Sequence, residues 1–392
     1  MRWISGTGDL LWFFAVAFVA AAVVSFVLTP VVRAAAIRVG MVDLPDQRRV
    51  NVQPVPRAGG IAAMAAFVAV GTVVAAVNEV ASIVAAPIFF DERELIALFA
   101  GSVAAALMGL IDDYLQVRAR WQLAGQLVLA FWAIALGIGV DSLYNPVSGG
   151  SIRLGELASI GFTAFWIVGM INAINFIDGL DGLSSGIGFI AAMTLGVISL
   201  TVTVGQPFIT LLCLVLAGAL LGFLRWNFHP AVIFAGTSGT MFLGYALALL
   251  AILGTAKVAV ALLVLGVPII DTFWIIVRRL VQGRAPFSPD RGHIHHRLLD
   301  LGLSHRQTVL AIYGICVALA VLSLVLSGSG QFYAFLGLFV ILGLALFLLA
   351  RRSLVAEELT ATAYEETDQW DEDEPAPAEA SDRETAGLND PG

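Results

Sequence analysis

Long apolar runs alternate with short polar segments along most of this chain. A helix that crosses a lipid bilayer needs about 20 consecutive, mostly apolar residues, and runs of about that length occur eleven times. They cover residues 10–32, 59–77, 94–111, 122–140, 157–173, 186–204, 208–224, 238–254, 257–277, 308–327 and 331–350. The pattern predicts an all-α integral membrane fold, a polytopic bundle of about eleven transmembrane helices.

The composition supports this interpretation. Hydrophobic residues make up 59% of the 392 residues and charged residues only 13%, whereas soluble domains carry about 25% charged residues. Too few charges remain to cover the surface of a soluble protein, so we expect an integral membrane protein. Cys213 and Cys316 both lie inside apolar runs, which argues against a disulfide framework and against a thiolate metal site.

Basic residues are divided unequally between the two sets of loops. One set (33–57, 112–121, 172–185, 225–237, 278–308 and 351–352) holds 16 Lys and Arg residues. The opposite set holds four, Arg2, Arg93, Arg153 and Lys257. Because Lys and Arg accumulate in cytoplasmic loops, we expect the N-terminus outside and the C-terminus in the cytoplasm.

The carboxyl-terminal segment differs in composition from the rest. Between Glu357 and Gly392 there are 13 acidic residues and one basic residue, Arg383. A segment with so much charge and so few aliphatic residues is typical of disorder. The sequence therefore predicts a transmembrane domain at 1–352 and an acidic, disordered tail at 353–392. No basic face exists outside short loops, so a nucleic-acid partner is excluded.

Polar side chains gather in the loops that the charge bias places in the cytoplasm. The third apolar run ends at Asp112-Asp113, and the fifth leads into the segment NAINFIDGLDGL at 172–183, where Asn172 and Asn175 are expected on one helical face. Further loops read RWNFHP at 225–230, GTSGT at 236–240 and SPDRGHIHHR at 288–297. Carboxylate and amide oxygens suit Mg²⁺, and Arg and His suit phosphate. The inventory predicts a site for Mg²⁺ and a diphosphate.

Simpler interpretations exist for each segment. Asp112-Asp113 alone could be a solvated helix end, and 172–183 could be an Asx-rich turn. The cluster His293, His295, His296 could suggest zinc, but no Cys lies nearby and no second His pair completes a tetrahedral set. Asp271 lies inside the ninth run, where an ionised carboxylate costs roughly 2.5–3.5 kcal/mol. It either lines a cavity or pairs with an Arg such as Arg278, and we favour the pairing.

Taken together, these segments resemble the polyprenyl-phosphate N-acetylhexosamine-1-phosphate transferase family. The resemblance covers about residues 40 to 310. It rests on Asp43-Leu44-Pro45, Pro56-Arg57-Ala58-Gly59-Gly60, the Asp112-Asp113 pair, the segment 172–182, the Gly236 loop and the His293–His296 cluster. The setting Phe287-Ser288-Pro289-Asp290 before His-Ile-His-His resembles the N-acetylglucosamine branch of the family.

The resemblance implies a reaction and a set of partners. It implies an enzyme that transfers N-acetylglucosamine 1-phosphate from UDP-N-acetylglucosamine to undecaprenyl phosphate, releasing UMP, at the cytoplasmic face of a bacterial cell membrane. The implied cofactor is Mg²⁺, with Mn²⁺ as the alternative ion. A phospho-N-acetylmuramoyl-pentapeptide or another UDP-N-acetylhexosamine remains an alternative donor. A homodimer is compatible with the family, since some of its members are dimeric.

The resemblance also assigns roles to residues. Asp112 and Asp113 would be the catalytic carboxylates. The metal ligands implied are Asn175 and Asp178, together with Thr237, which stands where the family has an Asp. The substrate-binding residues implied are Asn172, Asp181, Arg291, His293, His295 and His296.

One position departs from the family pattern. The family usually has Gly-Asp-(small)-Gly-Ser where this chain has Gly236-Thr237-Ser238-Gly239-Thr240. A hydroxyl can bind Mg²⁺, as the Ser/Thr of the P-loop does, but it brings no negative charge. We therefore expect weaker but functional metal binding, compensated by Asp178, Asp181 or a substrate phosphate. A catalytically silent membrane scaffold is the rival interpretation.

A transporter is the rival from another class. Transporters place coupling residues near the bilayer midplane on broken helices. Here nearly all ionisable residues lie in the loops and only Asp271 is clearly inside a predicted span. That distribution favours an enzyme acting at the membrane surface.

Overall fold

The computed structural model describes residues 7–43, 54–84, 91–145, 148–201, 204–254, 257–281, 283, 292–326, 328–345 and 347. The helices belong to one compact unit, Met1–Gly343. The tail expected at 353–392 lies outside the described residues. The helices are α1 (Thr7–Arg38), α2 (Gly60–Ala81), α3 (Glu92–Leu115), α4 (Ala119–Ala135), α5 (Glu156–Ile177), α6 (Leu183–Leu200), α7 (Pro207–Asn227), α8 (Gly236–Leu253), α9 (Lys257–Val264), α10 (Gly266–Val281), α11 (Ile294–Asp300) and α12 (His305–Val325).

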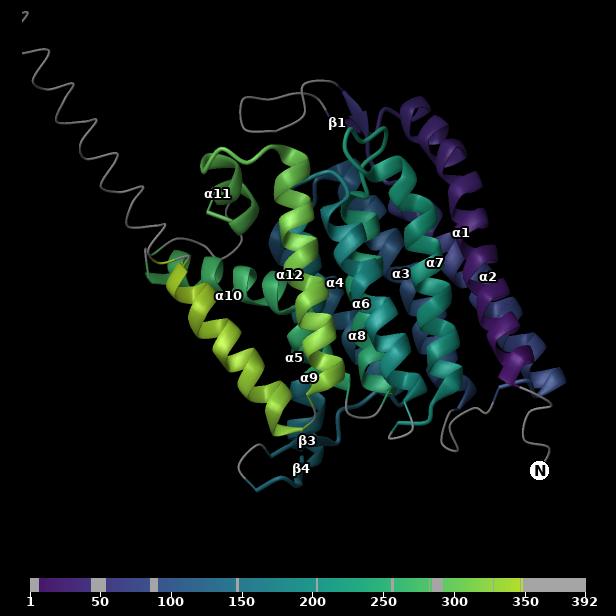
Figure 1. Ribbon diagram of the computed structural model, residues 1–392. Helices are drawn as coiled ribbons and strands as arrows, with labels where there is room; N and C mark the ends of the chain where they lie inside the picture. The colour runs from purple at the N-terminus through teal and green to yellow at the C-terminus, as the bar shows by residue number, and fades with distance from the viewer. Residues whose placement is uncertain are drawn as a thin grey trace, which may run out of the picture. The chain divides into compact units, whose positions relative to one another are not determined.

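Two short antiparallel strand pairs occur in the connections between helices. β1 (Val42–Asp43) pairs with β2 (Val55–Pro56), and β3 (Ser142–Tyr144) pairs with β4 (Ser151–Arg153). The two pairs lie at opposite ends of the long helices (Figure 1).

The apolar runs predicted from the sequence coincide with helices. Among the described residues, α1, α2, α3, α5, α6, α7, α8 and α12 are long and apolar enough to cross a membrane, which makes eight candidate spans, or nine with one bent pair. Two further predicted runs give shorter helices: α4 has 17 residues, and the other is the apolar helix Ser329–Ala345. The chain is a multi-pass, all-α membrane protein. The number eleven is not confirmed, and the orientation stays a prediction.

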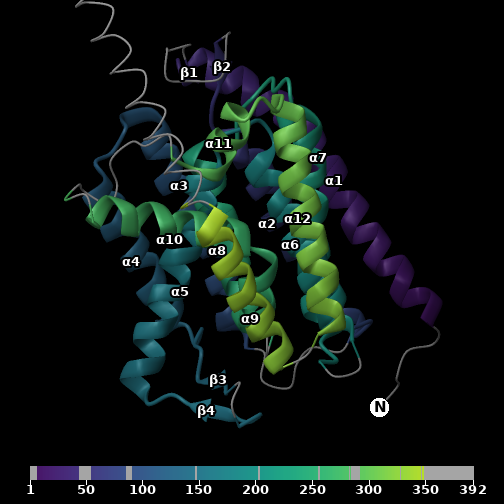
Figure 2. The same ribbon diagram turned by 60° about the vertical axis from the view of Figure 1, so that its left-hand side comes forward.

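The ninth apolar run is not one straight helix. It divides into α9 and α10, which meet at an angle of 77°, and α10 runs across the long helices rather than along them (Figures 1 and 2). Pro268 explains the break, because its nitrogen cannot donate to the carbonyl of Val264 and its ring clashes with that carbonyl. The bend carries Asp271 away from the course expected for a straight span.

Helix α8 lies at the centre of the bundle. It packs against α2, α3, α5 and α6, and its side chains are buried along almost its whole length. Two buried hydrogen bonds fix it to its neighbours: Tyr245 donates to the carbonyl of Ala97 at 2.9 Å, and Trp166 donates to the carbonyl of Ala248 at 3.1 Å. The first turn of α8 is thereby held beside the carboxyl ends of α3 and α5.

Candidate functional site

The ends of α3, α5 and α8 enclose a cavity of about 370 Å³ at the end of the bundle where β1 and β2 lie. We call it the acidic pocket, because four aspartates line it. Its wall consists of Asp43, Arg57, Asp113, Asn175, Asp178, Gly179, Leu180, Asp181, Asn227, Phe234, Ala235, Gly236, Thr237, His296 and His305. Of the residues that the sequence placed in the site, Asp113, Asn175, Asp178, Asp181, Thr237 and His296 are brought together here.

Asp113 is fixed by the first turn of α8. Its Oδ1 accepts the backbone N–H of Thr237 at 2.8 Å, and its Oδ2 accepts that of Ser238 at 3.0 Å. These N–H groups belong to the positive end of the helix dipole and favour a carboxylate. The approach requires Gly109, since a Cβ there would lie 2.3 Å from the carbonyl oxygen of Thr237. The loop that departs from the family pattern thus still holds Asp113.

Asp112 is held on another side of α3. Its Oδ1 accepts the side-chain amide of Gln122 at 2.6 Å and the backbone N–H of Val117 at 2.9 Å. It does not line the acidic pocket. The two carboxylates expected to act as a pair therefore face different surroundings, because consecutive residues of a helix point in different directions.

A second cavity, of about 220 Å³, opens beside Asp112 between α4 and α5. We call it the amide pocket; it is lined by Val117, Ala119, Gln122, Leu123, Gln126, Asn172 and Phe176. Asn172 lies here, donating to Oε1 of Gln126 at 2.6 Å and to the carbonyl of Val168 at 2.8 Å. Asn175, expected on the same helical face, lines the acidic pocket instead, where its Oδ1 accepts the Thr240 hydroxyl at 3.1 Å.

Asp178 ends α5 at the floor of the acidic pocket. Its Oδ1 accepts the hydroxyl of Ser184 at 2.5 Å. Burial raises the pKa of Asp178 to about 7; the negative charges of Asp113 and Asp181 add to the rise, while Ser184 and Arg57 oppose it. A carboxyl group in such surroundings favours a nearby cation. Asp113, Asn175 and Thr237 line the same cavity, and carboxylate, amide and hydroxyl oxygens are ligands that suit Mg²⁺.

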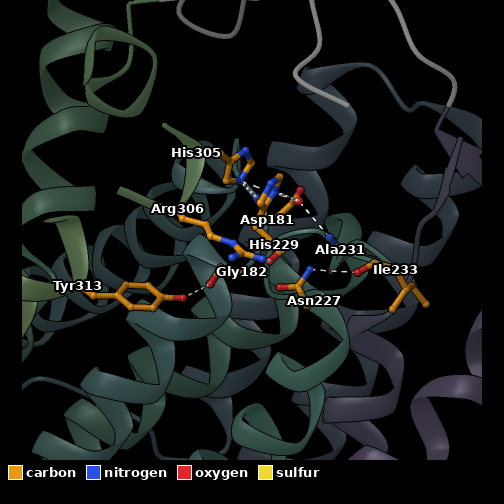
Figure 3. A network of polar contacts seen from close by, with 9 residues as sticks. All are labelled: Asp181, Gly182, Asn227, His229, Ala231, Ile233, His305, Arg306 and Tyr313. Atoms are coloured by element: carbon orange, nitrogen blue, oxygen red, sulfur yellow. Dashed lines mark hydrogen bonds and ion pairs between the residues drawn. The ribbon is translucent and has the colours of Figure 1, made fainter. Parts of the chain in front are cut away.

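Asp181 belongs to a hydrogen-bonded network that sequence reasoning did not find (Figure 3). Its Oδ2 accepts Nδ1–H of His229 at 2.7 Å and the N–H of Ala231 at 3.0 Å, while its own backbone N–H donates to Nε2 of His305 at 2.9 Å. The two imidazole rings stack with centroids 4.1 Å apart. These three side chains have the composition of a metal cluster, but in this arrangement hydrogen bonds engage the nitrogens that face Asp181.

The acidic pocket also contains basic groups. Arg57, which follows β2, forms an ion pair with Asp43 of β1, and both line the cavity. The hairpin therefore presents a guanidinium to the same space that Asp113 and Asp178 face. Both residues lie in segments that carried the family resemblance, but that resemblance gave them no role in the site.

The three histidines of the HIHH segment lie in three different environments. His293 donates from Nδ1 to Asp271 at 2.7 Å, and Asp271 also accepts the N–H of Ile294 at 2.9 Å. His295 is 1% exposed, and burial, followed by the positive potential of the neighbouring histidines, lowers its pKa well below the usual value. Only His296 lines the acidic pocket.

His295 and Asp271 therefore have structural positions. The ring of His295 rests on Gly179, where a Cβ would lie 2.1 Å from its Nε2. Asp271, fully buried in α10, anchors the HIHH segment to the bent helix. The expected pairing of Asp271 with Arg278 is corrected: the carboxylate of Asp271 binds His293 and the N–H of Ile294, because the bend at Pro268 brings α10 to that segment. Arg291 lies outside the described residues.

The sequence carries only weak signals for His229 and His305, the two histidines beside Asp181 that it did not predict. His229 stood in the RWNFHP loop, but nothing in the sequence related it to Asp181. His305 begins α12 behind a capping box, in which Ser304 accepts the N–H of Gln307 and the Gln307 side chain accepts the N–H of Ser304. The Ser-x-x-Gln spacing predicts a helix start, which would have placed His305 at the membrane surface.

Comparisons with known proteins identify the family of this chain. The family model described as "Glycosyl transferase family 4" matches residues 95–255, which include most of α3 and all of α5 and α8. A probable undecaprenyl-phosphate N-acetylglucosaminyl 1-phosphate transferase of Bacillus subtilis (strain 168) is 37% identical over 339 residues, covering 85% of this chain and 89% of the relative.

Two further relatives are named for other transferase activities. A decaprenyl-phosphate N-acetylglucosaminephosphotransferase of Mycolicibacterium smegmatis is 35% identical over 376 residues, 88% of this chain and 90% of the relative. A phospho-N-acetylmuramoyl-pentapeptide-transferase of Moorella thermoacetica is 32% identical over 238 residues, 56% of this chain and 72% of the relative. The chain therefore belongs to glycosyl transferase family 4, the polyprenyl-phosphate N-acetylhexosamine-1-phosphate transferases.

Proposed function

We propose that this protein transfers N-acetylglucosamine 1-phosphate from UDP-N-acetylglucosamine to undecaprenyl phosphate and releases UMP. The observation that carries the proposal is the acidic pocket, where Asp113, Asn175 and Asp178 face Arg57 across one cavity. Relatives that align over most of this chain are named for transfer of this sugar phosphate to a polyprenyl phosphate.

The acidic pocket is the proposed binding site for the nucleoside diphosphate. Asp113, Asn175, Asp178 and Thr237 would hold Mg²⁺, which when bound supplies neutralisation of phosphate charge. Arg57 and His296 are placed to donate hydrogen bonds to phosphate oxygens. Asp181, oriented by His229 and Ala231, would accept a hydrogen bond from the nucleoside.

The two carboxylates of α3 have separate proposed tasks. Burial raises the pKa of Asp113, and the two backbone N–H groups of α8 that bind its carboxylate oppose that rise. Asp112, which accepts a hydrogen bond from Gln122 of the amide pocket, would orient the attacking lipid phosphate. Phosphoryl transfer of this kind depends on positioning and on charge stabilisation.

The lysine and arginine bias of the loops supports a cytoplasmic position for this end of the bundle. UDP-N-acetylglucosamine would then enter from the cytoplasm and undecaprenyl phosphate from the bilayer. Exposed apolar side chains along α1 and α12, among them Leu11, Val19, Leu310 and Val321, suit contact with lipid.

The test is label transfer by the purified protein in lipid. Radiolabelled UDP-N-acetylglucosamine and undecaprenyl phosphate with Mg²⁺ are expected to give a labelled lipid and UMP in equal amounts. UDP-N-acetylmuramoyl-pentapeptide in place of the sugar nucleotide is expected to give none. Absence of a lipid product from any UDP-N-acetylhexosamine would overturn the proposal.

Thr237 gives one specific reason for a second candidate, a catalytically silent membrane scaffold. The pocket lacks the carboxylate that the family pattern has at this position. A silent protein would give no product with any donor, and Thr237→Asp would restore the labelled lipid.

A further inference from the structure

Helices α1 and α7 lie side by side (Figures 1 and 2). Two glycines of α7 allow a close approach, because a Cβ at Gly218 or Gly222 would lie 2.2 or 2.1 Å from a carbonyl oxygen of α1. The only acidic residue of α1 is Asp9, in its first turn, and α7 has none. At the end near β1, neither helix therefore supplies a carboxylate to balance a basic side chain.

Trp226, at the end of α7, fixes the two helices to each other there. Pro30 of α1 has no N–H, so the carbonyl of Phe26 lacks the donor that a regular helix supplies four residues later. The indole N–H of Trp226 donates to this carbonyl at 3.1 Å, and the rings of Phe26 and Trp226 lie 5.2 Å apart. The hydrogen bond and the ring contact hold the indole in place against α1.

Two exposed arginines are held beside this indole. The guanidinium carbon of Arg225 lies 5.9 Å from the centroid of the Trp226 ring. Nε of Arg33 donates to the carbonyl of Val232 at 3.0 Å, and the N–H of Val232 donates to the carbonyl of Trp226 at 3.0 Å. Within the described residues, no carboxylate forms an ion pair with either arginine. We call Arg33, Arg225 and Trp226 the arginine patch.

The chemistry of the arginine patch suits an anion that carries apolar chains. Arg33 uses its Nε for Val232, which leaves its η nitrogens as donors, and guanidinium groups bind phosphate oxygens through such donors. Exposed apolar side chains lie next to the patch, Val27 beside Phe26 on α1 and Leu221 one turn from Arg225 on α7. A free phosphate would match the arginines alone, whereas a phospholipid matches the arginines and the apolar surface.

The arginine patch is separate from both cavities of the candidate site. None of its three residues lines the acidic pocket or the amide pocket. Tryptophan and arginine are typical of the level where a membrane meets water, because each has an apolar part and a polar end. The patch therefore lies where the headgroups of membrane lipids are expected, outside the residues proposed for the reaction.

We propose that the arginine patch binds the headgroup phosphate of an anionic phospholipid, with phosphatidylglycerol as the representative ligand. The phosphate accepts hydrogen bonds from Arg33 and Arg225, and the acyl chains pack on the exposed apolar side chains of α1 and α7. Basic sites between transmembrane helices bind anionic headgroups in this way. The ligand is a lipid of the surrounding membrane and neither substrate of the proposed reaction.

The test is native mass spectrometry of the full-length protein in detergent, which measures the affinity for the first bound lipid. Phosphatidylglycerol is compared with phosphatidylcholine of the same acyl chains, which has no net charge. Arg33→Gln/Arg225→Gln removes both charges, and Arg33→Lys/Arg225→Lys replaces both guanidinium groups but keeps the charges. Arg120→Gln is the matched control, since Arg120 also lies over a tryptophan, Trp121 at 5.7 Å, but on α4.

The wild type and Arg120→Gln are expected to bind phosphatidylglycerol about tenfold more tightly than phosphatidylcholine. The double Gln variant is expected to lose this preference, and the double Lys variant to keep most of it. Equal affinities of the wild type for both lipids, a preference that survives the double Gln variant, or an equal loss in the Lys and Gln variants would overturn the proposal. Undecaprenyl phosphate at equal concentration is expected to displace little of the bound phosphatidylglycerol. Preferential binding of undecaprenyl phosphate would assign the patch to the acceptor and overturn the proposal too.

Discussion

The acidic pocket and the amide pocket lie side by side, and their linings are opposite in kind. The acidic pocket brings together Asp43, Asp113, Asp178 and Asp181 with Arg57, whereas no charge lines the amide pocket. The first suits metal and phosphate, and the second suits a neutral, hydroxylated group. The two linings therefore suit different chemical groups.

The division passes between neighbouring residues. Asp113 turns to α8 and the acidic pocket, and Asp112 turns to Gln122 of α4. Asn175 and Asn172 divide in the same way. Residues that look equivalent in the sequence therefore have different surroundings, and we expect substitutions to separate their effects.

The largest expected effect is at Asp113. Asp113→Asn removes the charge that faces the metal site, and we expect the rate of label transfer to fall by about 100- to 1,000-fold, as for the loss of one preorganised electrostatic group. Asp112→Asn should cost less, about tenfold, with a higher KM for the lipid. Asp91→Asn, at the other end of α3, is the control and should leave the rate unchanged. Equal losses at 112 and 113 would contradict the division.

Asp271→Asn should lower stability more than it alters either pocket. The substitution disturbs two buried hydrogen bonds, to His293 and Ile294, so we expect a loss of about 1–3 kcal/mol in the free energy of unfolding. Thermal unfolding in detergent measures it. If stability is unchanged, Asp271 does not anchor the HIHH segment.

The raised pKa of Asp178 makes stability depend on pH in the absence of metal. Because burial raises its folded-state pKa to about 7 from 3.8, the folded protein binds more protons than the unfolded chain between these values. Stability should therefore fall as pH rises from about 4 to about 7, by up to about 1.4 kcal/mol per pH unit.

Thermal unfolding with a chelator at several pH values tests this expectation, with Asp178→Asn as the comparison. The variant should lack the slope contributed by position 178. Saturating Mg²⁺ should reduce the slope in the wild type, because a cation stabilises the ionised carboxylate. An identical slope in the wild type and the variant would show that another group titrates.

The smallest expected effect is at His229. His229→Ala removes one of two donors to Asp181, so the affinity for UMP should fall a few-fold. His229→Asn keeps an N–H near the position of Nδ1 and should restore most of it. Calorimetry measures both, and if the two variants lose affinity equally, His229 does not act through its hydrogen bond to Asp181.

The sequence predicts the helices well because the apolar runs are long and uninterrupted. It missed the break at Pro268, since an apolar run remains apolar across a proline. It placed Asp113, Asn175, Asp178 and Asp181 at one end of the bundle, because each ends a run that leaves the membrane on the same side.

Finer features depend on which face of a helix each residue occupies. The separation of Asp112 from Asp113 was within reach, because adjacent helical residues do not face each other. The contacts of His229 and His305 with Asp181 join segments 48 and 124 residues apart, and no local pattern encodes them. The structural positions of His293 and His295 likewise depend on the bend of α10 and on Gly179.

The most direct test of the account is Mg²⁺-dependent label transfer by the wild type beside Thr237→Asp. We expect the wild type to form labelled lipid only with Mg²⁺, and the variant to reach half-maximal activity at about a tenfold lower Mg²⁺ concentration. That result would place position 237 at the metal in the acidic pocket. Activity of the wild type that needs no divalent cation, or an unchanged Mg²⁺ requirement in the variant, would contradict the account.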